Sequence, residues 1–161
     1  MKNIVSIPYY NRYIFSITSI WMLIPIYYSY NNYKIFNFNL TLNMFISIIH
    51  WLFYKHNSTL HYLDKFFSTN TLFIIMLNTN NYIIYFISPF IYIFILTSRK
   101  LMFDNNYKQH LINHLIFRYL AFWCCCIYID HYNYNIFKIY TNIYILTNYI
   151  FYKIFKNNYI F

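Results

Sequence analysis

The stretch Tyr82–Thr97, YIIYFISPFIYIFILT, contains sixteen residues and no charged side chain. The whole chain has the same character, since 60% of its 161 residues are hydrophobic, 27% are aromatic and only 9% are charged. Soluble domains carry about 25% charged residues, and so few ionised groups cannot cover a surface that faces water. The chain is therefore predicted to be an integral membrane protein whose outer side chains contact lipid.

Part of this composition has a second explanation, which is the codon bias of an AT-rich genome. The chain has no Gly, and Ala121 is its one Ala. Such a bias explains the abundance of Tyr, Ile and Asn, but it also raises the Lys content, and this chain is not rich in Lys. The shortage of charge therefore still indicates a membrane.

Six stretches approach the roughly 17 to 25 residues that a helix needs to cross a hydrocarbon core of about 30 Å. The predicted spans are 13–30, 36–54, 60–77, 82–97, 110–129 and 136–155. Pro25 predicts a kink in the first span, and the third is the weakest because charged residues lie in its opening turns. No linker or second domain separates the spans. Residues 1–161 are thus predicted to form one all-α, multi-pass bundle of about six transmembrane helices, with five or seven spans as alternatives.

The basic residues are distributed unevenly between the two sides of this layout. Nine of the twelve fall on or next to the side that holds the N-terminus, Lys34 and Lys138 fall on the other side, and Arg118 lies inside the fifth span. The positive-inside rule then predicts a cytoplasmic N-terminus. Lys2 and Arg12 precede the first span without a small-residue cleavage site, so this segment is predicted to be retained.

The net charge of +9 is scattered among membrane-flanking turns and forms no stripe. Lipid headgroups are therefore the expected partners, and nucleic acid is not.

Some residues within the spans are interpreted as structural. The run Cys124–Cys126 matches no disulfide framework or metal motif and is predicted to be small apolar filler. Trp51 and Trp123 lie at span ends, which predicts an aromatic belt at the membrane surface. Arg118 is expected to snorkel or to pair with Asp130 or a headgroup.

Ionisable side chains at membrane depth are costly and tend to mark function. Ser47 and His50 lie late in the second span, Asp64 opens the third, and His110 and His114 open the fifth. Because alternate spans return to the same side, these residues are predicted to lie at one face of the membrane, the cytoplasmic one.

The two histidines of the fifth span are four residues apart, so their imidazoles share one face of a helix. With His50 from a neighbouring helix they form a three-His set that leaves one position open, which is the arrangement of catalytic zinc. Asp64, or Ser47 beside it, could orient or deprotonate a bound water. The predicted site therefore has His50, His110 and His114 as ligands of Zn²⁺, with Asp64 and Ser47 as catalytic residues.

This pattern resembles the superfamily of alkaline ceramidases and progestin/adiponectin receptors. The resemblance covers about 46–64 and 110–123, and it implies a seven-helix membrane protein with an intramembrane zinc held by three His and lipid-amide hydrolase activity. One departure is that the Ser of the family precedes the first His by four residues. Here position 46 is Ile46, and Ser47 precedes His50 by three, about 60° off that helical face at 100° per residue.

Two hypotheses of function follow. The first is a zinc-dependent hydrolase of lipid amides or esters. The second is a non-catalytic subunit of a larger membrane complex, or a structural membrane protein, encoded in an AT-rich organellar, protist or viral genome. Partner membrane subunits are expected under the second hypothesis.

Overall fold

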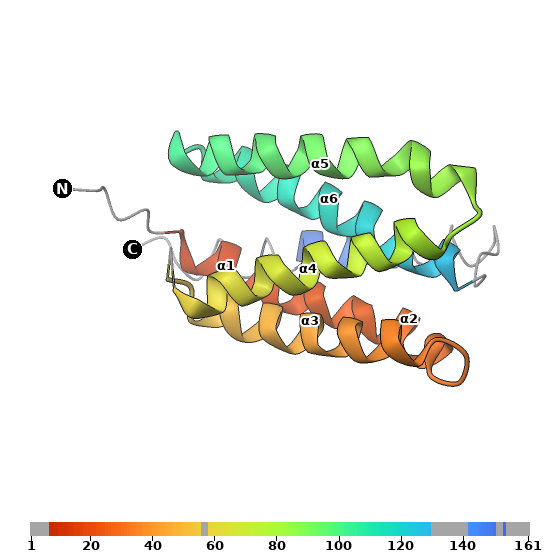
Figure 1. Cartoon of the computed structure of the whole chain (residues 1–161). Helices are drawn as coiled ribbons and strands as arrows, with labels where there is room; N and C mark the ends of the chain where they lie inside the picture. Colours follow the sequence, from red (N-terminus) through yellow and green to blue (C-terminus); the bar gives the residue numbers. More distant parts are fainter. Residues whose placement is uncertain (1–6, 56–57, 130–141, 151–152, 154–161) are drawn as a thin grey trace.

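The computed structural model describes residues 7–55, 58–129, 142–150 and 153. Over these ranges the chain is helical and contains no strand, which confirms the all-α fold class. The helices run back and forth along one direction (Figure 1), as expected for helices joined by short turns.

The first hydrophobic stretch folds as α1 (Tyr9–Ser19), a 3₁₀ turn η1 (Ile20–Met22) and α2 (Leu23–Ser29). The irregular turn lies just before Pro25. A proline has no N–H to bond the carbonyl four residues earlier, and its ring clashes with that carbonyl. The regular α-helix is thus interrupted next to the position where the proline predicts a kink.

Three helices within the described ranges are long and apolar enough to cross a membrane: α3 (Lys34–Leu52), α5 (Tyr82–Phe103) and α6 (Tyr107–Tyr128). At about 1.5 Å per residue, a helix of 22 residues such as α5 or α6 extends about 33 Å, close to the thickness of a hydrocarbon core. These helices coincide with the predicted spans 36–54, 82–97 and 110–129.

The other predicted spans are less apolar or only partly described. α4 (Thr59–Asn78) is a 20-residue helix over the predicted span 60–77, but it is not among the three apolar candidates. Residues 142–150 are helical, and most of the rest of the predicted span 136–155 lies outside the described residues. Helix formation is thus confirmed where the chain is described, whereas six crossings stay a prediction.

The outside of the bundle is apolar. The side chains of Ile35, Tyr82 and Phe86 are 79%, 88% and 71% exposed, and many other large apolar residues share this exposure. Soluble monomers rarely expose continuous apolar patches of more than a few hundred Å². A lipid environment accounts for such a surface, because apolar side chains need no shielding there.

Polar side chains in the turns cap the N-terminal ends of the helices. Ser58 caps α4 by accepting a hydrogen bond from the His61 N–H at 3.2 Å, and Asn81 caps α5 through the Ile83 N–H at 3.0 Å. Between α5 and α6, Asn105 has a φ of 57°. A Gly usually occupies such a left-handed position, and in a chain without Gly, Asn is the residue that tolerates it best.

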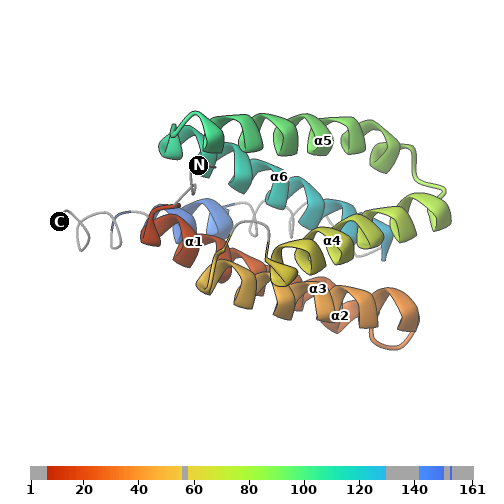
Figure 2. The same ribbon diagram turned by 60° about the vertical axis from the view of Figure 1, so that its left-hand side comes forward.

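The helices pack in antiparallel neighbours, α3 with α4 and α5 with α6, and α1 packs on α3 (Figures 1 and 2). Asn39 of α3 binds two residues of α4, since it donates to the Thr71 hydroxyl at 2.6 Å and accepts from the Asn70 amide at 2.7 Å. These bonds give the polar residues of α4 partners inside the bundle. The thiols of Cys124–Cys126 are free and buried in the core, as predicted.

Candidate functional site

The site residues predicted from the sequence lie at one end of the bundle, where α3 ends and α4 and α6 begin. The Asn11 amide at the start of α1 donates to the Tyr107 carbonyl at the start of α6, at 3.1 Å. The Tyr54 hydroxyl after α3 contacts the sulfur of Met102 near the end of α5, at 3.4 Å. These contacts join the start of α1 to the start of α6 and the end of α3 to the end of α5.

Ser47 and Asp64 lie close to each other across α3 and α4, so the Ser47 hydroxyl interacts with the Asp64 carboxylate. The offset of Ser47 by about 60° from the face expected in the family does not prevent this contact. Arg118 of α6 donates from Nη2 to the Ser47 Oγ at 2.9 Å. Since the Ser47 oxygen accepts from the guanidinium, its own hydrogen is available for the carboxylate of Asp64.

Arg118 is only 8% exposed, so the prediction that it snorkels to the membrane surface is wrong. Its Nη1 donates to the Phe15 carbonyl, to the Thr18 hydroxyl at 2.9 Å and to the Ser19 hydroxyl at 2.7 Å. The α1 segment thus supplies three oxygen acceptors for a buried cation, and a charge buried without such partners would be strongly destabilising. Asp130, the other expected partner, lies outside the described residues.

His110 and His114 face the same side of α6, and their ring centroids are 5.5 Å apart. Both contact Ser98 of α5, whose Oγ lies 2.9 Å from His110 Nδ1 and 3.4 Å from His114 Nδ1. His110 Nδ1 also lies 2.9 Å from the Ser98 carbonyl oxygen. A carbonyl can only accept, so this bond assigns the proton to Nδ1 and leaves a lone pair on Nε2.

Several polar atoms at this end are buried and have no hydrogen-bond partner within the described ranges. They include His50 Nδ1, His110 Nε2, His114 Nε2 and Asp64 Oδ1, and also Asn11 Oδ1 and Trp51 Nε1. More than about 90% of buried polar groups in proteins have a partner. Zinc binds imidazole nitrogens and carboxylate oxygens, so the chemical types of these donor atoms are suitable for this metal.

Two aromatic rings pack against the imidazoles. The ring of Trp51 contacts His50 and His114, with centroid distances of 5.0 and 4.8 Å, and Phe15 lies 4.1 Å from His114. Among the described residues, no group of three or more His, Cys, Asp or Glu is arranged to hold a metal ion. The structure therefore pairs His110 with His114 and Ser47 with Asp64, while His50 packs against Trp51.

The aromatic belt predicted from Trp51 and Trp123 is wrong for both residues, because their side chains are only 5% and 3% exposed. Trp51 lies beside the candidate site instead, and its indole also contacts the ring of Phe15 at 4.5 Å between centroids. Two further residues contact the site residues: Ser98, for which the sequence predicted no role, and Arg118, which was expected to snorkel or to pair with Asp130 or a headgroup. The one signal for Arg118 was its charge in the middle of an apolar span.

No protein-family model, curated protein or solved structure matches this chain. The contacts of its own residues are therefore the basis for a function.

Proposed function

We propose that this membrane protein binds zinc at the end of the bundle where α3 ends and α6 begins, and hydrolyses a lipid amide or ester there. The observation that carries the proposal is the set of buried imidazole nitrogens without partners on His50, His110 and His114, together with a partnerless oxygen of Asp64 at the same end of the bundle. The three candidate spanning helices support the membrane setting.

His110 and His114 are the first residues that would hold the metal. They are one helical turn apart, and the Ser98 carbonyl fixes the His110 tautomer that presents Nε2 to a cation. His50 would complete the set after the Trp51 ring moves from its contact with both imidazoles. When bound, zinc polarises a carbonyl and makes water nucleophilic at neutral pH.

Asp64 is the residue of the chain best placed to move a proton. Its side chain lies close to the Ser47 hydroxyl, which accepts a hydrogen bond from Arg118, and its Oδ1 has no hydrogen-bond partner in the described part of the chain. A carboxylate held in this way can accept a proton from water and return it to a leaving group. Phe15 and Trp51 cover the cluster and reduce its contact with bulk water.

Metal analysis of the detergent-purified full chain tests the zinc site. We expect about one zinc per chain, and its loss in His114→Ala and His110→Ala. His131→Gln is the control for histidine content, because the sequence assigns that residue no role. Protein without zinc, or zinc retained in both α6 variants, would refute the metal site.

Activity is tested with a fluorogenic N-acyl amide and the matching ester in mixed micelles. Asp64→Asn should lower hydrolysis by about 10² to 10⁴-fold, the usual contribution of an acid or base, while zinc content stays unchanged. Thr69→Ala, an exposed substitution on α4, is the control. Unchanged hydrolysis in Asp64→Asn, or no hydrolysis by the zinc-loaded protein, contradicts the proposed enzyme.

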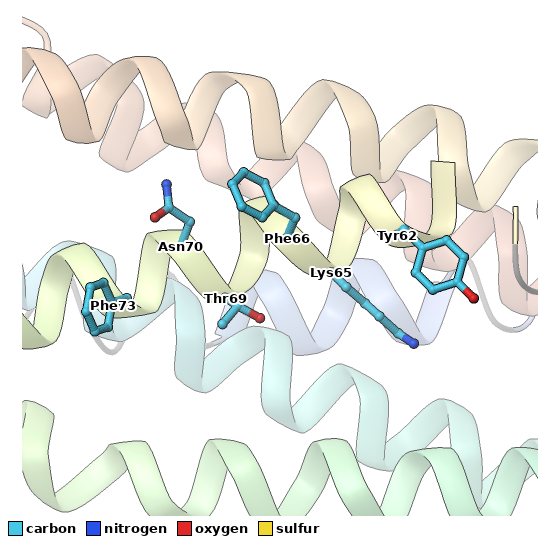
Figure 3. Close-up of a pocket in the computed structure, with 6 residues that line it drawn as sticks. All are labelled: Tyr62, Lys65, Phe66, Thr69, Asn70 and Phe73. Carbon is cyan, nitrogen blue, oxygen red and sulfur yellow. The ribbon is translucent and has the colours of Figure 1, made fainter. Parts of the chain in front are cut away.

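A second candidate function, a subunit of a larger membrane complex, is favoured by one face of α4. This α4 face surrounds an opening of about 450 Å³ and is shown in Figure 3; it comprises Tyr62, Lys65, Phe66, Thr69, Asn70 and Phe73. Phe66 and Phe73 are 61% and 58% exposed. Helices in membranes associate through faces that combine small polar residues with close packing, and a partner helix would cover this one.

Cross-linking in native membranes tests the second candidate. A cysteine at Thr69 should cross-link to a partner and give a species heavier than the monomer. A cysteine at Ile93 on α5, which is 55% exposed, is the matched control and should stay monomeric. Monomer alone from both positions argues against a subunit role for the α4 face.

A further inference from the structure

A second feature lies on the other side of α6, away from the imidazoles. At 100° per residue, Leu115 and Tyr119 lie about 140° and about 180° around α6 from His110, whereas Leu111 lies about 100° from it. Together with the helical residues 142–150, this face forms a groove of about 450 Å³, which we call the α6 groove. Its lining includes none of the proposed zinc ligands, and its occupant does not depend on the proposed function.

The far wall of the α6 groove is held to α6 by Tyr144. Its hydroxyl donates to the Leu115 carbonyl at 3.1 Å, and its ring lies 5.2 Å from the Tyr119 ring and 5.5 Å from the Trp21 ring, between centroids. These contacts hold the helical residues 142–150 against α6 and so form the groove.

The shape of the groove fits an extended hydrocarbon chain. Its lining on α6 runs from Lys108 to Tyr119, which is about 16 Å of helix at 1.5 Å per residue. Between these ends the lining is aliphatic, with Ile112 and Ile116 on α6 and Ile145 opposite. An apolar lining of this length matches the methylene chain of a lipid, which needs no polar partners.

The charge at one end of the groove selects the headgroup. Residues 142–150 run antiparallel to α6 (Figure 2), so Tyr149 lies toward Lys108. Lys153 follows one turn later, is exposed, and places its ammonium 4.9 Å from the centre of the Tyr149 ring. Two exposed ammonium groups therefore flank the same end of an apolar groove, where an anionic phosphate would be attracted.

From these observations we propose that the α6 groove is a binding site for one anionic phospholipid. An acyl chain lies along Leu111, Leu115 and Ile116, and the phosphate contacts Lys108 and Lys153. A lipid that only surrounds the protein would show no preference for a headgroup and no dependence on the groove. The site is thus distinct from ordinary contact with bulk lipid.

The test uses the detergent-purified full chain with phosphatidylglycerol or phosphatidylcholine of identical acyl chains, and native mass spectrometry of the retained lipid. We expect one phosphatidylglycerol to be retained preferentially, and glycerol phosphate, which lacks acyl chains, not to be retained. The double variant Lys108→Gln, Lys153→Gln should weaken retention by roughly thirty-fold, from the usual attraction of two basic residues near a membrane surface. Lys100→Gln, on exposed α5, is the control.

A groove-filling variant, Ile116→Trp, keeps every charge and should also displace the lipid. Circular dichroism and elution as a single species check that each variant is folded, and zinc content serves as an independent readout of the other site. Equal retention of the two lipids, an effect of Lys100→Gln equal to that of the double variant, or full retention in Ile116→Trp would each overturn the proposal.

Discussion

Replacing Arg118 by Met should strongly destabilise the bundle. Its guanidinium donates to four oxygens, those of Phe15, Thr18, Ser19 and Ser47. Thr18 and Ser19 keep a second bond to the Phe15 carbonyl, at 3.0 Å each, so they are not left without partners. The main cost is therefore the negative charge of Asp64 beside an apolar side chain.

Breaking a buried charge pair by removing one member costs about 3 to 5 kcal/mol, and we expect this loss in the free energy of unfolding of Arg118→Met. Asp64→Asn should cost less, about 1 to 3 kcal/mol, because the guanidinium keeps its hydroxyl and carbonyl acceptors. In the double variant neither charge is left alone. Its loss should be smaller than the sum of the two single losses by about 2 kcal/mol, a coupling typical of contacting residues.

The free energies are measured by SDS titration of the protein in mixed micelles, followed by circular dichroism. Thr71→Val is the matched control, since it removes a bond of 2.6 Å between α3 and α4 without touching a charge. Bonds of this kind between membrane helices contribute about 0.6 kcal/mol on average. Additive losses for Arg118→Met and Asp64→Asn, within about 0.5 kcal/mol, would refute an electrostatic link through Ser47.

Three further predictions concern the site and the turns. Ser98→Ala keeps the carbonyl that faces His110 but removes the hydroxyl that contacts Nδ1 of both His110 and His114. It should weaken zinc binding by about 10-fold, the lower end of the usual effect of losing a group that orients a ligand, whereas Thr97→Ala, which loses a bond within its own helix, should not. Equal zinc affinities in a competition titration would count against a role of the hydroxyl. Trp51→Ala should strengthen zinc binding if the indole keeps His50 from the other ligands, and weaker binding in the same titration would contradict this. Asn105→Gly should leave the free energy of unfolding equal or raise it. Asn105→Val should lower the free energy of unfolding by about 1 to 2 kcal/mol, because a branched side chain opposes a positive φ. Equal stability of the two variants in the SDS titration would contradict the backbone explanation.

Part of the candidate site could be predicted from the sequence. The pair His110 and His114 follows from helical spacing, and the contact of Ser47 with Asp64 follows from antiparallel neighbours that share an end. Zinc and hydrolysis stay predictions, because no ligating group of three is assembled in the described residues. The bonds from Arg118 to Thr18 and Ser19 were not foreseen, since about 100 residues separate these partners and nothing in the local pattern marks their contact.

By itself, the sequence determined that the chain is helical and lies in a membrane. A stretch of about 20 residues without charged side chains can be recognised locally, and a helix that crosses lipid must have such a stretch. It also determined where helices begin, since Ser58 and Asn81 bind backbone N–H groups within three residues. Only the tertiary structure decided which polar residues turn inward. Trp51 is buried although its position at a span end is typical of an interfacial residue, and the partners of a buried side chain come from other helices, which no pattern within one helix can specify.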